Sequence, residues 1–129
     1  MILTIRTDNP EAEVGLYSQD QQLSYRKWPA DRRLAKELLG AIRDELHAHH
    51  ADWHDITGVI AYQGPGSFTG LRIGLTVANS IAYGLQVPVI AAQGDGWIAA
   101  GQQRLAAGED DRLALPHYGA EANITLPKK

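Results

Sequence analysis

A glycine-rich turn at residues 64–67 is the first place where this sequence could bind a ligand. Glycines flank Pro65, an apolar strand-like run precedes the turn, and a long helical pattern follows it. A strand, a glycine turn and a helix N-terminus together present bare N–H groups and a positive dipole end, which suits an anion. The spacing is not the G-x-x-x-x-G-K-[ST] pattern of a phosphate-binding loop. We interpret Gly64, Pro65, Gly66 and Ser67 as a structural turn that starts the helix, with a phosphate cradle as the alternative.

Histidines and one serine are the other side chains with reactive chemistry. His47, His49, His50 and His54 lie within eight positions. No nearby pair of acids completes a recognisable metal site, so we interpret these histidines as the solvated end of a helix. Ser67 has no histidine and aspartate partners that the sequence can assign, which argues against a nucleophile. The sequence therefore predicts no catalytic, cofactor-binding or metal-binding residue.

The composition indicates a globular protein with a single core. The chain has 129 residues, 44% of them hydrophobic, with a net charge of −3 and no cysteine. This charge excludes the overall basic field of an autonomous nucleic-acid-binding protein, and the lack of cysteine excludes disulfides and thiolate metal sites. No apolar run approaches the roughly 20 residues that cross a bilayer. We expect a cytoplasmic protein that makes no membrane contact.

The elements that must position these residues follow the order β-β-β-α-β-α-β-α. Three strands close together in sequence favour an antiparallel meander, and the later strands alternate with helical patterns. A polar link follows the last helix and is expected to be flexible. This order favours an α/β fold with a mixed sheet and helices on its faces. The expected strands are residues 2–7, 14–17, 23–28, 56–62 and 87–92, the expected helices 31–50, 71–86 and 95–105, and the link 107–111.

The second helical pattern carries two apolar stripes, about 110° apart on a helical wheel. A helix that rests on one sheet needs only one such stripe, so a second stripe indicates burial on two sides. Either the preceding helix or another protein covers it, and glycines let a second backbone approach closely. The first stripe is Leu71, Leu75, Ala78, Ala82 and Leu85, and the second is Gly70, Ile73, Gly74, Val77, Ile81 and Gly84.

The turn and the helix resemble one protein family closely. Residues 64–74 read GPGSFTGLRIG and match the full pattern G-P-G-S-F-T-G-L-R-I-G of the bacterial TsaB (YeaZ) family. The end of the chain resembles the family's P-x-Y…I-T-x-P-K-K close at Pro116, Tyr118, Ile124, Thr125, Pro127, Lys128 and Lys129. The resemblance implies a ribonuclease-H-like, actin-like ATPase (ASKHA) lobe. It divides the chain into an N-terminal lobe at 1–106 and a linker with a C-terminal tail at 107–129.

Two departures from the family pattern bear on activity. Family members usually have a second lobe between the third helix and the tail, so this chain resembles a shortened form. The first strand of actin-like folds normally ends in D-T, where the acid serves metal–phosphate chemistry, and here Arg6 stands before Thr7. A guanidinium can neither ligate a cation nor act as a base. Independent ATP hydrolysis is therefore not expected.

The resemblance implies a partner subunit rather than an enzyme. TsaB proteins pair with TsaD, which transfers threonylcarbamoyl to tRNA in threonylcarbamoyladenosine (t6A) synthesis, or form homodimers through the same helices. A TsaE-like ATPase joins the pair, and tRNA is contacted only through the complex. The alternative is a small nucleotide-binding ATPase or phosphotransferase that uses the glycine turn. The residues expected at the partner interface are Gly70, Leu71, Ile73, Gly74, Val77, Ala78, Ile81 and Gly84.

Overall fold

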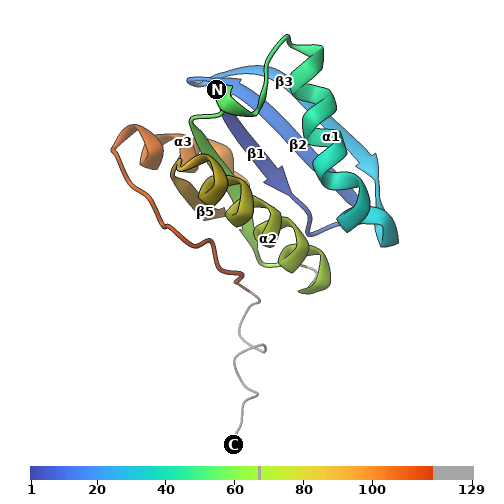
Figure 1. Cartoon of the computed structure of the whole chain (residues 1–129). Helices are drawn as coiled ribbons and strands as arrows, with labels where there is room; N and C mark the ends of the chain where they lie inside the picture. The colour runs from blue at the N-terminus through green and yellow to red at the C-terminus, as the bar shows by residue number, and fades with distance from the viewer. Residues whose placement is uncertain (67, 118–129) are drawn as a thin grey trace, which may run out of the picture.

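Five strands form one mixed sheet in the computed structural model, which describes residues 1–66 and 68–117 (Figure 1). The spatial order is β3-β2-β1-β4-β5, with antiparallel pairing from β1 to β3 and parallel pairing of β4 with β1 and β5. The observed element order is the one that the sequence predicts. The strands are β1 (Ile2–Arg6), β2 (Glu11–Ser18), β3 (Gln21–Pro29), β4 (Gly58–Gly64) and β5 (Val89–Gln93).

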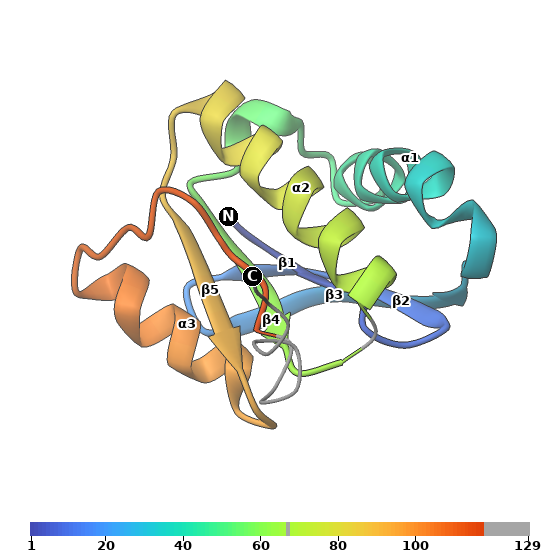
Figure 2. The ribbon, with the colours of Figure 1, turned by 90° about the horizontal axis from the view of Figure 1, so that it is seen from below.

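Three α-helices cover the two faces of this sheet. Figure 2 shows α1 (Leu34–Ala48) and α2 (Phe68–Leu85) on one face and α3 (Trp97–Ala106) on the other. A short 3-10 turn, Asp31–Arg33, leads into α1, and a second one, Trp53–Asp55, precedes β4. The helices α1 and α2 therefore lie side by side on the same face of the sheet, where they contact each other.

Alternation along the strands explains which residues make the core beneath α1 and α2. Trp28 of β3 donates a hydrogen bond to Glu37 of α1 at 3.2 Å, so this position of β3 faces the helix. The register then places Ala12, opposite Trp28, on the same side, together with every second residue of β2. The fully buried residues that α1 contributes to this layer are Leu38, Ile42 and Leu46.

The opposite face is closed over β4 by α3, which lies close because of a glycine. A Cβ on Gly101 would lie 2.5 Å from Cγ2 of Ile60, nearer than carbon atoms pack. At the same layer, the rings of Tyr62 and Trp97 meet edge to face with centroids 5.7 Å apart. The small residue in α3 thus sets the distance between this helix and the sheet.

Both edges of the sheet are protected. At the β5 edge, the N–H groups of Val89 and Ala91 donate to Asp110 Oδ1 and Asp111 Oδ2 at 3.1 and 2.8 Å, and the Asp111 N–H donates to Val89 O at 2.9 Å. Arg104 holds Asp111 from α3. The acidic link expected to be flexible instead pairs with a strand. The β3 edge has exposed lysine and proline at its end and an irregular register at Leu16/Tyr17, features that discourage strand addition.

The chain beyond Asp111 returns across the sheet towards the glycine turn. Asn79 of α2 clamps Ala114, donating to its carbonyl at 3.0 Å and accepting its N–H at 2.7 Å. The His117 N–H donates to Gln63 O at 2.8 Å at the end of β4. Of the residues that carry the resemblance of the tail, only Pro116 lies within the described part of the chain. The division of the chain at residue 106 stays a prediction.

Candidate protein interface

The glycine turn is filled by the chain's own atoms. Gly64 ends β4 with φ +119°, a conformation that favours glycine, and a Cβ there would lie 2.2 Å from the carbonyl oxygen of His117. The Tyr62 hydroxyl donates to Pro65 O at 3.1 Å. These contacts fix the direction in which α2 leaves the sheet. Ser67 lies outside the described residues.

A carboxylate already occupies the corner between the turn and the first strand. A Cβ on Gly66 would lie 2.4 Å from Cβ of Asp8, whose side chain is 7% exposed. Arg6 donates to both oxygens of Asp8, at 2.7 and 3.2 Å, and its guanidinium lies 3.9 Å from the centroid of the Tyr62 ring. The hydrogen bond with Asp8 raises the pKa of Arg6, which burial alone would lower. A resident anion with its own cation argues against a phosphate cradle at this corner.

The sequence did not identify Asp8, because the D-T ending of the first strand in actin-like folds places the acid at the position of Arg6. The acid stands two residues further along the chain, and the alternation of Arg6 and Asp8 was the available signal. Their pairing leaves the carboxylate engaged by a guanidinium. Behind them, burial followed by a hydrogen bond to Glu13 raises the pKa of Tyr25, and burial raises that of Tyr17. Both phenols stay neutral near pH 7 and supply no base.

The eight residues expected at the partner interface separate into three groups in the structure. Leu71 and Ala78 have no exposed surface and pack in the core of the chain itself, because their stripe rests on the sheet. Gly74 and Ile81 are buried as well, whereas Gly70, Ile73 and Val77 are half-buried and Gly84 is exposed. The two fully buried residues have no surface to offer a partner while the chain stays folded. The half-buried and exposed residues of the set leave a partly open face: Gly70, Ile73, Val77 and Gly84.

The glycine at position 74 has a contact within its own chain. A Cβ there would lie 2.1 Å from Oγ1 of Thr7, and this hydroxyl donates to Gly70 O at 2.6 Å. Thr7 follows the central strand β1, so glycine lets α2 approach the sheet at this point. The immediate neighbour of Gly74 is therefore Thr7 of its own chain, and a place for this glycine in a partner interface stays a prediction.

What remains of α2 is an outward face with almost no charge. We call seven exposed or half-buried residues the outer α2 face: Thr69, Gly70, Ile73, Thr76, Val77, Ser80 and Gly84. The exposed side chains of Arg72 and Tyr83 border it. Over its 18 residues α2 has one charged side chain, Arg72. Helices that face water usually carry many charged residues on their outer side, as α1 does. An uncharged outer face of small side chains suits close packing against a second helix.

Leu39 of α1 adjoins the outer α2 face and is 49% exposed. Glu37 and Glu45 of α1 contact β3, and at about 100° per residue Leu39 points to the other side of the helix, towards α2. The sequence could not assign the side of α1 that joins an interface. The contacts of the two glutamates show which side of α1 faces β3 and therefore which side faces α2.

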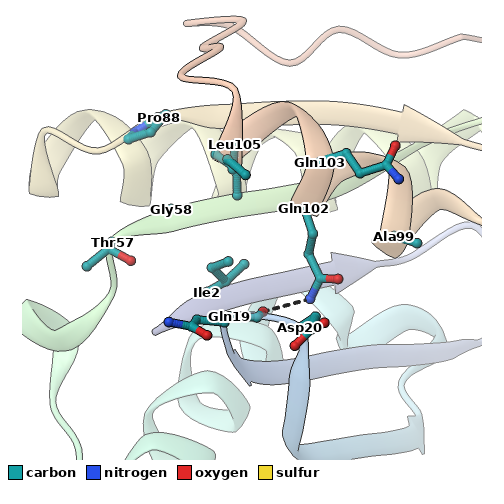
Figure 3. A pocket seen from close by; sticks show the side chains of 11 residues that line it. Ile2, Gln19, Asp20, Thr57, Gly58, Pro88, Ala99, Gln102, Gln103 and Leu105 are labelled. Carbon is teal, nitrogen blue, oxygen red and sulfur yellow. Dashed lines mark hydrogen bonds between the residues drawn. The ribbon is translucent and has the colours of Figure 1, made fainter.

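A cavity among the described residues lies elsewhere and lacks catalytic groups. It measures about 740 Å³ and lies between α3, the start of β4 and the β2–β3 turn (Figure 3). Gln102 spans it and donates to Gln19 O at 3.0 Å. Asp20 is its one titratable lining residue, so no acid–base pair is available there.

The histidine cluster is exposed and dispersed around the end of α1. His47 lies in α1, His49 and His50 follow it, and His54 lies in the second 3-10 turn. Within residues 1–66 and 68–117, no three histidine, aspartate or glutamate side chains are close enough together to hold a metal ion. In the same part of the chain, no helix has the length and apolar character to cross a membrane.

Comparison with known proteins places this geometry in a family. A family model described as "TsaD: tRNA N6-adenosine threonylcarbamoyltransferase" matches residues 29–103. The "tRNA threonylcarbamoyladenosine biosynthesis protein TsaB" of Escherichia coli (strain K12) is 31% identical over 124 residues, covering 91% of this chain and 53% of that protein. The chain belongs to the TsaB (YeaZ) family. The protein of the same description in Bacillus subtilis (strain 168) is 28% identical over 90 residues, covering 70% of this chain and 39% of the relative.

Solved structures of TsaB (YeaZ) relatives agree with the sheet and helix arrangement. The structure "YeaZ from Pseudomonas aeruginosa" superposes with a TM-score of 0.68 at 28% identity, covering 83% of this chain and 49% of that one. Thermus thermophilus RuvC, in complex with a Holliday junction substrate, has a TM-score of 0.50 at 19% identity over 84% of this chain and 71% of its own. This second likeness concerns the fold alone. The predicted ribonuclease-H-like, ASKHA-type lobe is confirmed.

The chain spans about half the length of the TsaB relatives that it matches, 53% of the Escherichia coli protein and 39% of the Bacillus subtilis protein. The matched part includes the whole of β4, the glycine turn and α2, which lie within residues 29–103. The helix with the uncharged outer face is therefore part of the region that defines the family. For this chain, the activities and partners of its longer relatives are therefore proposals.

Proposed function

We propose that this chain is a non-catalytic subunit in tRNA t6A biosynthesis that docks on a TsaD-like threonylcarbamoyltransferase through the outer α2 face. The observation that carries this proposal is the lack of charge on that face, next to the half-exposed Leu39 of α1. A surface of small, uncharged side chains on a long helix gains little from water and packs closely against another helix. Membership of the TsaB (YeaZ) family supports t6A biosynthesis as the process in which the chain acts.

The contacts around the glycine turn at residues 64–66 favour a non-catalytic role for this chain. Arg6 and Asp8 neutralise each other beside Gly66, and Gly64 is covered by the backbone of His117. In this proposal the TsaD-like partner performs the transfer in the cytoplasm. A TsaE-like ATPase joins the pair, and tRNA is bound through the complex. A homodimer through the same face is the competing assembly.

The test is co-purification with the TsaD-like protein of the same organism. Ser80→Arg places a long cation in the middle of the outer α2 face at an exposed position, so the chain should stay folded while the partner no longer binds. Ala100→Arg is the matched control, because Ala100 is also exposed but lies on α3, across the sheet. Loss of partner with the first variant alone is the expected result. Equal binding by both variants, or no binding by the unmodified chain, would refute the proposal.

A further inference from the structure

The exposed side of α1 carries cations along a line. Lys36 and Arg43 are both exposed and lie within about 20° of each other at 100° per residue. Arg32 extends the line from the 3-10 turn before the helix and is exposed as well. Among the described residues, Arg32 and Lys36 have no ion-pair partner. We call these three residues the basic stripe.

Acids near the basic stripe do not neutralise it. Asp44 contacts Arg43 at 3.4 Å, but both side chains are more than half exposed, and such a pair is weak in water. Glu37 binds Arg33 and Trp28, on the side of α1 that faces β3. A helix of a chain with net charge −3 therefore presents a local positive surface.

The basic stripe borders the outer α2 face. Leu39 lies between them on α1, about 60° from Lys36 towards α2. At the N-terminal ends of the two helices, Arg32 and Ile73 line the same cavity of about 400 Å³. Its wall also holds the apolar Leu34 and the buried Asp8, whose carboxylate Arg6 already pairs. An apolar face and a positive rim thus form one continuous surface. Its layout is that of a protein interface with an apolar centre and a charged border.

We infer that the partner of the outer α2 face presents an acidic surface opposite α1. The inference rests on the proposed docking function and adds the chemistry of the partner. Carboxylates on the partner would pair with Lys36, Arg43 and Arg32 while its apolar side chains cover Leu39 and α2. Charge complementarity of this kind chiefly accelerates association and rejects wrong partners.

A second copy of the chain would bring one exposed carboxylate on α1, Asp44, which already contacts its own Arg43. The one charged residue of α2 is Arg72, which is itself a cation, and α1 would bring its own basic stripe. Two copies joined through these helices would gather like charges, which opposes association. RNA would supply negative charge, but phosphates do not cover an apolar strip formed by Leu39, Ile73 and Val77. The combination of apolar and basic surface favours an acidic protein.

The experiment measures association of the full chain with the TsaD-like protein in stopped flow at low and high salt. Lys36→Glu should slow association about tenfold at low salt, and Lys36→Glu with Arg43→Glu should slow it further, with the difference shrinking at high salt. Lys27→Glu is the matched control, because Lys27 is also exposed but lies on β3, away from α2. The control should associate like the unmodified chain.

Three results would overturn the inference. The first is association at the same, salt-independent rate for Lys36→Glu and Lys27→Glu, which leaves the docking proposal intact if Ser80→Arg still abolishes binding. The second is a dimer of the chain alone in sedimentation that Ser80→Arg abolishes. The third is binding of tRNA by the chain alone that Lys36→Glu abolishes while the association rate with the protein partner does not change.

Discussion

Two glycines of α2 should respond in opposite directions to the same substitution. Gly74 is buried, and a Cβ there would lie 2.1 Å from Oγ1, 3.0 Å from Cγ2 and 3.1 Å from Cβ of Thr7. Gly84 is exposed and has no atom within 4 Å of the added carbon. Both positions are in the same helix, so alanine gains about 1 kcal/mol of helix propensity at each.

At Gly74 this gain is outweighed. Forcing a methyl group against Thr7 costs about 1–3 kcal/mol in overpacking, and displacing the Thr7 hydroxyl costs about 0.5–1.5 kcal/mol of its hydrogen bond to Gly70. We expect Gly74→Ala to lower the free energy of unfolding by about 1–3 kcal/mol and Gly84→Ala to raise it by about 0.5–1 kcal/mol. For a chain of this length each kcal/mol moves Tm by about 3–6 °C.

Urea unfolding followed by far-UV circular dichroism measures both variants. Thr7→Ala removes the two atoms nearest to the added methyl group, so Gly74→Ala should cost much less in that background. The double-mutant cycle separates this contact from any general effect of alanine. A Gly74→Ala variant as stable as Gly84→Ala would refute the view that this glycine exists to receive Thr7.

Two further predictions concern the segment after α3. Burial alone would raise the pKa of Asp111, but hydrogen bonds from Arg104 and from a strand N–H, together with the charge of Arg104, lower it below 3.8. The carboxylate therefore stabilises the fold fully above that pH and loses its effect as pH falls through the lowered pKa. Asp111→Asn should cost about 1–2 kcal/mol in urea unfolding at pH 7, and the difference from the unmodified chain should shrink in acid as pH falls through the lowered pKa. Asn79→Ala removes both hydrogen bonds to Ala114 and should lower stability by about 1–2 kcal/mol. Trypsin should then cleave after the exposed Arg112 faster than in the unmodified chain, and an unchanged cleavage rate would contradict the clamp.

The sequence predicted the elements well because each has a strong local signal. The buried run before Gly64 and the helical spacing from Leu71 to Leu85 are visible within a short window. The strands β2 and β3 extend further than expected, over Glu11–Ser18 and Gln21–Pro29, because pairing within a hairpin continues past the apolar residues. The presence of a helix or strand follows from its local sequence pattern, whereas the length of a strand depends on the neighbouring strand with which it pairs.

The candidate interface could be predicted only in outline. Two apolar stripes were evident, yet their division into core and surface depends on contacts between residues far apart in sequence. Thr7 contacts Gly70 across 63 positions, and no periodicity within α2 reveals it. The side of α1 that carries Leu39 likewise became clear only from the contacts of Glu37 with β3.

The acidic link after α3 shows a second limit of local reasoning. Residues 107–111 are small, polar and charged, which is typical of a mobile segment. Asp110 and Asp111 nevertheless satisfy the N–H groups of Val89 and Ala91, about 20 positions earlier in the chain. Composition indicates how well a segment is solvated, but it does not show whether the fold brings that segment close enough to a strand edge to form hydrogen bonds.

The protected edges of the sheet restrict how this protein can assemble. Carboxylates occupy the free N–H groups of β5, and the irregular register, lysine and proline of β3 discourage a neighbouring strand. Strand addition would allow copies to add without limit, as in fibrils, whereas docking through one helical face ends once that face is covered. The proposed docking through the outer α2 face would run perpendicular to the sheet and would end in a complex of fixed size.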